Sequence, residues 1–141
     1  MLAAYARSQY QEMQVQTTPG RLVVMLYDGA LRFMHTALDA LRRGEREIQG
    51  TALGKAQAIL CELIDTLDRD AGEVAHRLDS IYRYCLQRLL IANAEDRAEY
   101  IEEVIRHMAS LREAWDQAER SLHAPEERSM EEAPVLVGAC R

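Results

Sequence analysis

Glu73 and His76 form the one Glu-x-x-His pair of the chain, the spacing with which some helical bundles hold a di-iron centre. Such a centre needs a second pair and two further inward-pointing glutamates. The chain has no second pair. His76 also falls on the polar side of its predicted helix. Glu73 fits the glutamate position of a capping box, three residues after Asp70. We therefore predict a solvated histidine here and no metal site.

Other reactive side chains form no recognisable catalytic group. The remaining histidines are isolated, and we expect them to be exposed or hydrogen-bonded; they are His35, His107 and His123. The run "TPGR" at Thr18 lacks the G-x-x-x-x-G-K-[ST] spacing of a phosphate-binding loop. The cysteines show no CxxC spacing, and we interpret them as reduced thiols, two of them in the core; they are Cys61, Cys85 and Cys140. These patterns predict neither an enzyme nor a cofactor.

The composition indicates one folded domain. The chain has 141 residues, of which 48% are hydrophobic and 28% charged, enough for a core of its own. A net charge of −6 argues against binding to nucleic acid or to anionic membranes. No stretch approaches the roughly 18 apolar residues of a membrane span, and the N-terminus lacks the apolar core of a signal peptide. We expect a cytoplasmic protein that does not insert into membranes.

The periodicity is helical almost throughout. Prolines occur only at positions 19, 125 and 134, so no residue between 20 and 124 must break a helix. The pattern predicts four helices, with "RGEREIQGT" as the first connection or the frayed start of the second helix. Their ranges are Pro19 to about Arg43, Thr51 to Arg69, Asp70 to about Asn93, and Asp96 to about Leu122.

Helix-start signals support these boundaries. Thr18 suits an N-cap with Pro19 at the first helical position. Asp70 with Glu73, and Asp96 with Glu99, match the capping-box spacing, each cap being worth ~1 kcal/mol. Because the connections are short, neighbouring helices should be antiparallel. The prediction is an all-α, up-down antiparallel four-helix bundle.

Two segments of different character flank the predicted bundle at 18–122. Residues 1–17 are mostly polar with a few apolar anchors, which indicates a mobile N-terminal arm; the anchors are Tyr5, Tyr10, Met13 and Val15. Residues 123–141 contain two prolines and the acidic run "EERSMEE", typical of a disordered, solvated tail.

Helical wheels separate the first helix from the others. At about 100° per residue, the apolar residues of helices 51–69 and 96–122 each cover about 140°, an ordinary core-facing stripe. Those of helix 19–43 spread over about 200°. We expect that one bundle core cannot cover so wide an arc. The residues concerned are Leu22, Val23, Leu26, Tyr27, Ala30, Leu31, Phe33, Met34, Ala37, Leu38 and Leu41.

Three residues add detail to this pattern. Gly29, in the middle of helix 19–43, costs that helix roughly 1 kcal/mol relative to alanine. We favour a close helix crossing there, with the approach of a partner's backbone as the alternative. On helix 70–93, Tyr84 and Ile91 line up within the polar side.

The surplus apolar surface has two interpretations. Helix 19–43 is either the most central helix or covered by the N-terminal arm, or else it forms a groove for a partner. Large apolar patches on soluble proteins usually mark interaction sites, and a docked helix or a wrapped peptide would suit this one. Both interpretations hold if the arm covers the groove until a partner displaces it.

Four blocks of sequence, in order over about residues 5–120, resemble the flagellar export chaperone family FliS. They are "YQEMQVQTTPGRLVVMLYDGALRF" from Tyr10, "KAQAILCELIDTLD", "LDSIYRYCLQRLLIAN" and "EEVIRHMASLREAWDQA". The chain departs from some relatives between Val15 and Pro19, which is one residue shorter, and at the compact segment from Arg69 to Glu73.

The resemblance implies a bundle without catalytic activity that binds the disordered C-terminal segment of flagellin. It further implies that the chaperone prevents premature polymerisation and keeps flagellin ready for the flagellar type III export gate. In this family the N-terminal arm is thought to lie over part of the hydrophobic site when flagellin is absent. By motif position, we expect Tyr10 and Val15 to anchor the arm. The groove, or its support, would comprise Leu22, Leu26, Tyr27, Tyr82, Leu89 and Ile91.

Three alternatives stay open at this point. A regulatory adaptor would bind another flagellar export or transcription factor through the same groove. A cofactor or metal bundle would need inward ligands. Dimerisation of the free protein through the same apolar surface is also open.

Overall fold

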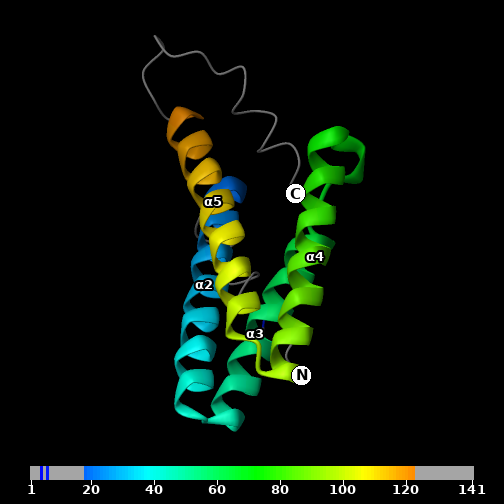
Figure 1. Ribbon diagram of the computed structural model, residues 1–141. Coiled ribbons are helices and arrows are strands. Elements are labelled where there is room, and N and C mark those ends of the chain that lie inside the picture. Colours follow the sequence, from blue (N-terminus) through cyan, green and yellow to red (C-terminus); the bar gives the residue numbers. More distant parts are fainter. Residues whose placement is uncertain (1–3, 5, 7–17, 123–141) are drawn as a thin grey trace.

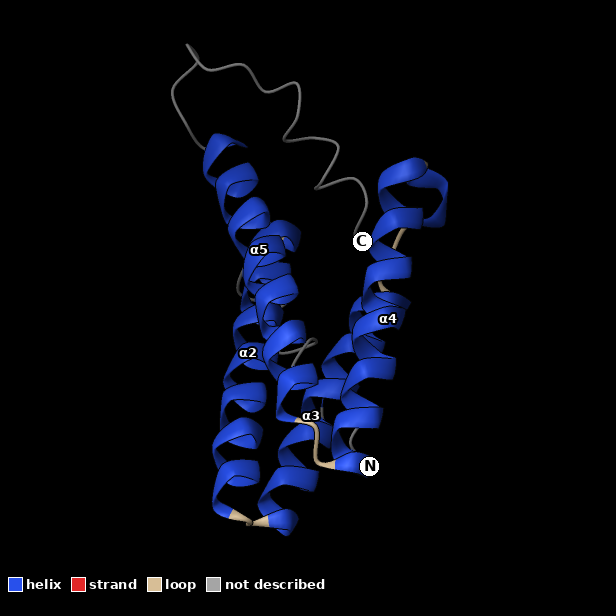
Figure 2. Cartoon of the chain, in the orientation of Figure 1, coloured by secondary structure: helices blue, strands red, loops and turns tan. Residues whose placement is uncertain are grey.

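The computed structural model describes residues 4, 6 and 18–122, which form a bundle of four long helices (Figure 1). A single 3₁₀ turn interrupts the second connection, and helix accounts for nearly all of residues 18–122 (Figure 2). This confirms the predicted all-α bundle. The elements are α2 (Pro19–Arg43), α3 (Arg46–Asp65), η1 (Arg69–Ala71), α4 (Glu73–Glu95) and α5 (Ala98–Leu122).

The helices follow one another around a ring. α2 packs against α3 and α5, and α4 packs against the same two helices from the opposite corner. Ion pairs at both ends of α2 give the direction of α5: Arg21 meets Asp116 at 3.3 Å, and Arg42 meets Glu102 at 3.5 Å. The up-down antiparallel arrangement is therefore confirmed.

The start of α2 agrees with its sequence signal. The Thr18 side chain accepts a hydrogen bond from the backbone N–H of Arg21 at 3.2 Å, and Pro19 occupies the first turn, as predicted. The helix ends at Arg43, and Gly44 caps it with a φ of 75°, in the left-handed region that glycine adopts easily.

Both predicted capping boxes are wrong. Asp70 lies within η1, and Gly72, with a φ of 87°, takes the N-cap position of α4. Asp96 ends α4, at a φ of 54°, and does not begin α5. Its carboxylate accepts hydrogen bonds from Gln49 at 3.1 Å and from Arg46, so contacts with α3 outweigh the local capping preference.

The second helix begins earlier and ends earlier than predicted. Only Gly44 and Glu45 separate α2 from α3, so the stretch expected as a connection is mostly helical. Gln49 explains the early start, because its buried amide donates to Asn93 at 3.1 Å and fastens the first turns of α3 to α4. Arg69, expected at the helix end, belongs to η1.

The expectation that one core cannot cover the apolar arc of α2 is also wrong. Of the eleven apolar residues on that arc, Leu31, Phe33 and Leu41 are half-buried against the core and the rest are buried. Because α2 packs on α3 and on α5, neighbours cover both flanks of its stripe. Ala6 lies in the same buried cluster. The central position of α2 thus accounts for most of its apolar surface.

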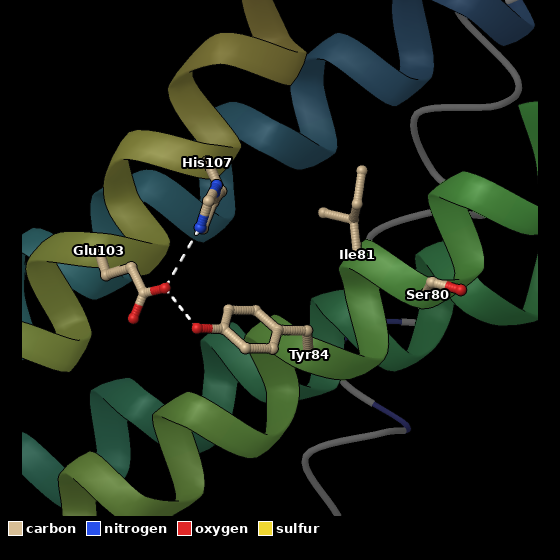
Figure 3. Close-up of a pocket in the computed structure, with 5 residues that line it drawn as sticks. All are labelled: Ser80, Ile81, Tyr84, Glu103 and His107. Atoms are coloured by element: carbon tan, nitrogen blue, oxygen red, sulfur yellow. Dashed lines mark hydrogen bonds and ion pairs between the residues drawn. The ribbon is translucent and has the colours of Figure 1, made fainter.

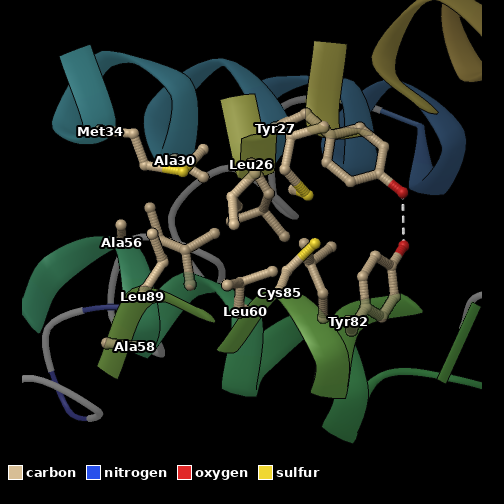
Figure 4. Packing of buried hydrophobic residues seen from close by; sticks show 14 of the residues in the cluster. Leu26, Tyr27, Ala30, Met34, Ala56, Ala58, Leu60, Tyr82, Cys85 and Leu89 are labelled. Atoms are coloured by element: carbon tan, nitrogen blue, oxygen red, sulfur yellow. Dashed lines mark hydrogen bonds between the residues drawn. The ribbon is translucent and has the colours of Figure 1, made fainter. Parts of the chain in front are cut away.

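The centre of the bundle contains a polar contact across its diagonal. The hydroxyls of Tyr27 on α2 and Tyr82 on α4 share a hydrogen bond between fully buried rings (Figure 4). Cys85 lies close to them, and burial raises the pKa of its thiol to about 12. Gly29 is buried where a Cβ would lie 3.3 Å from Ile59, which supports the close helix crossing.

Several predictions concern residues beyond the described part of the chain. The mobile arm at 1–17, its anchors Tyr10 and Val15, and the disordered tail at 123–141 lie largely or wholly outside it. The division into arm, bundle and tail therefore stays a prediction. Within 18–122, no helix combines the length and the apolarity needed to cross a bilayer.

Candidate peptide-binding cleft

A cleft of about 390 Å³ opens between α4 and α5 (Figure 3). Ile81 and the ring of Tyr84 contribute from α4, and His107 contributes from α5. Tyr84 keeps 40% of its surface exposed, one of the few large hydrophobic side chains of the bundle to do so. The remaining lining residues are Ser80 and Glu103. The cleft thus has apolar walls and polar groups at its rim.

A polar network holds Tyr84 across the cleft. Its hydroxyl donates to the Glu103 carboxylate, while Arg88 donates to the Tyr84 oxygen at 2.9 Å. Arg88 also pairs with Glu103 at 3.1 Å and stacks 4.3 Å from the centre of the Tyr100 ring. The Tyr84 ring is therefore fixed in position although it is exposed.

Glu103 is the electrostatic centre of this network. The hydrogen bond from Tyr84 lowers the pKa of the Glu103 carboxyl, and His107 at 3.4 Å and Arg88 lower it further. The rings of Tyr84 and His107 meet edge to face, with their centres 6.0 Å apart. Glu103 is thus an anion at neutral pH that ties both helices to the exposed ring.

The chemistry of the cleft suits binding. Its apolar walls can receive an aliphatic or aromatic side chain, and its rim can meet the polar groups of a peptide backbone. The described residues contain no cluster of three or more side chains that would hold a metal ion. Glu73 and His76, the pair with di-iron spacing, are both exposed on α4.

The predicted site residues lie mostly beneath the surface. Five of the eight are buried: Leu22, Leu26, Tyr27, Tyr82 and Leu89. Ile91 is half-buried on α4, and Tyr10 and Val15 lie outside the described residues. The structure joins Tyr27 to Tyr82, and none of the six described residues lines the cleft. Their role in binding stays a prediction, namely that they support the binding surface from the core.

Sequence reasoning missed most residues that line the cleft. Tyr84 did carry a signal, because it is a large aromatic residue on the polar side of a helix. Glu103 and His107 carried none, since they are one helical turn apart on a charged face of α5 and meet Tyr84 only after α4 and α5 pack.

Comparison with known proteins places the chain among bacterial flagellar proteins. The family described as "Flagellar protein FliS" matches residues 1–122, which include all four helices. The match ends where α5 ends, so residues 123–141 lie beyond it.

Curated relatives share similarity over most of their length. The flagellar secretion chaperone FliS of Bacillus subtilis (strain 168) is 37% identical over 113 residues, which cover 79% of this chain and 84% of the relative. The FliS chaperone of Campylobacter jejuni is 41% identical over 99 residues, covering 70% and 77%. That of Salmonella typhimurium is 35% identical over 118 residues, covering 82% and 87%.

Proposed function

Since the chain belongs to the FliS family of flagellar secretion chaperones, we propose that it binds the C-terminal segment of flagellin. In the bacterial cytoplasm it would prevent premature polymerisation and keep flagellin competent for type III export. The loaded complex would then be presented to the export gate.

The observation that carries this proposal is the cleft between α4 and α5. Its exposed ring, Tyr84, is held by Glu103 and Arg88, so the surface is organised before any ligand arrives. A preformed aromatic surface reduces the entropic cost of binding a disordered peptide, which must itself become ordered. Such a partner binds a large area with modest affinity, which suits a chaperone that must release its cargo.

The predicted groove residues of α4 fit this proposal as support for the bound segment. Tyr82 and Leu89 are buried on the helix that carries Tyr84, and Ile91 lies two turns along the same face as Tyr84. We propose that Tyr10 and Val15 anchor the arm over part of the same binding surface until flagellin displaces it.

A seeded polymerisation assay tests the proposed function. Monomeric flagellin of the same organism is mixed with flagellar seeds, and elongation is followed by light scattering. We expect an equimolar amount of the chain to suppress elongation, and smaller amounts to suppress it in proportion. Elongation at the same rate with and without the chain would contradict the proposal.

A further inference from the structure

A second hollow of about 340 Å³ lies between α2 and α3, away from the cleft described above. Phe33 from α2 and Ile48 from α3 are its large apolar residues, and Ile48 keeps 47% of its surface exposed. The other lining residues are Thr36, Glu47, Thr51, Ala52 and Lys55. We call this surface the α2/α3 groove.

One end of the α2/α3 groove is cationic. The Lys55 ammonium lies 5.4 Å from the centre of the Phe33 ring, and the Arg32 guanidinium lies 5.7 Å from it. Arg32 makes no ion pair with any residue in the range 18–122 that the structure describes. Positive charge from these two side chains at one end of the groove favours an anionic ligand there.

The opposite end of the groove is apolar with one acid. Ile48 and Glu47 lie about two turns from Lys55 along α3, which is about 10 Å at a rise of ~1.5 Å per residue. A fitting ligand therefore has its acidic part at the Arg32 end and an aliphatic part at the Ile48 end. The ligand should carry no acidic group where it lies beside Glu47.

The chain itself contains a segment with this order of residues. The run at 126–132, "EERSMEE", holds four glutamates and one arginine, and "VLV" follows at 135–137. We propose that this C-terminal segment of the same chain, residues 126–138, docks in the α2/α3 groove. Its glutamates lie beside Arg32 and Lys55, and its Val-Leu-Val run packs on Phe33 and Ile48.

The length of the chain permits this docking. α5 ends at Leu122. This end lies close to the start of α2, since the Thr18 hydroxyl donates a hydrogen bond to the Glu119 carboxylate at 2.6 Å. From Thr18 to Arg32 is about 21 Å along α2 at ~1.5 Å per residue. The nine residues from Leu122 to Glu131 span up to about 30 Å at ~3.3 Å each. The acidic run therefore reaches the cationic end first, and the aliphatic run reaches Ile48 after it.

Tethering makes a weak contact sufficient. A segment joined by a short linker acts at an effective concentration of the order of millimolar, so the groove is occupied even when the free peptide would bind poorly. Any other ligand of the groove must first displace the segment. The segment lies beyond the family match at 1–122. Docking of the segment in the α2/α3 groove therefore does not rest on the flagellin-binding proposal.

Cys140 provides a natural reporter at the end of the segment. In the full chain, Cys61→Ser removes the exposed thiol of α3, and burial raises the pKa of Cys85 to about 12 and protects it from labelling. A nitroxide on Cys140 then broadens backbone amide signals near it. We expect loss of amide intensity at residues 33–36 and 47–52, relative to the sample with the nitroxide reduced.

Charge variants test how the segment is recognised. Arg32→Glu should restore most of the lost intensity, and raising the salt concentration to about 1 M should do the same, because screening then acts within ~3 Å. Arg106→Glu is the matched control: it makes the same charge change at an exposed arginine of α5 and should restore none.

Four results would overturn the proposal. They are no intensity loss, loss confined to the cleft between α4 and α5, equal recovery in both charge variants, or loss that Arg32→Glu and salt leave unchanged. A mixed sample of isotope-labelled chain without nitroxide and unlabelled chain with nitroxide covers the remaining case. Loss at the groove in that sample would assign the segment to a second copy and overturn docking within one chain.

Discussion

Replacing Gly20 with alanine should lower the free energy of unfolding by about 1–2 kcal/mol, although alanine is the better helix former. An added Cβ would lie 2.0 Å from Oε2 of Glu119 on α5. That carboxylate is buried and accepts a hydrogen bond from the Thr18 hydroxyl at 2.6 Å. Charge-assisted bonds of this kind contribute about 1.5–3 kcal/mol, which exceeds the helix-propensity gain of at most ~1 kcal/mol.

Urea denaturation followed by circular dichroism measures this effect, and Gly29→Ala is its control. At Gly29 a Cβ would meet only the terminal methyl of Ile59, at 3.3 Å, which can shift by a small rotation. We therefore expect Gly29→Ala to change stability by less than Gly20→Ala does. Unchanged or increased stability in Gly20→Ala would show that the contact with Glu119 does not hold α2 to α5.

Replacing Tyr84 with alanine should weaken binding of the flagellin C-terminal segment by about tenfold or more. Exposed aromatic residues at interface centres typically contribute 1–2 kcal/mol or more, and ~1.4 kcal/mol corresponds to a factor of ten. Tyr84→Phe should lose less, because the ring stays and only its bond to Glu103 is removed. Titration calorimetry with the purified segment measures all three affinities.

Leu90→Ala is the matched control for Tyr84→Ala. Leu90 is 54% exposed on the same helix and does not line the cleft, so its variant should bind normally. Both side chains lie at the surface, and neither variant should unfold the bundle. An equal loss of affinity in Leu90→Ala and Tyr84→Ala would place the binding surface outside the cleft.

Local sequence signals predicted a helix boundary correctly where residues within one turn determine it. Thr18 and Pro19 begin α2 as expected, because the cap needs only residues within one turn. Asp70 and Asp96 show the limit of such signals. Asp96 has the sequence of a cap, yet Arg46 and Gln49, about fifty residues earlier in the chain, draw its carboxylate towards α3.

Apolar periodicity predicted correctly which residues are buried, but it did not distinguish core residues from residues of a binding surface. The wide arc of α2 suggested a binding groove, but an arc of that width is covered when one helix packs between two others. The large residues chosen from that arc, such as Leu26 and Tyr27, are core residues. Tyr84 was visible as an aromatic residue on a polar face, whereas its partner Glu103 became apparent only from the packing of α4 on α5.

Titration of intact flagellin against the chain, with and without the flagellin C-terminal segment, tests the central claim most directly. We predict saturable binding at micromolar concentrations to intact flagellin, and none to flagellin that lacks the segment. Equal binding to both forms would place the contact elsewhere on flagellin. No binding to either form would contradict the claim that this bundle is a flagellin chaperone.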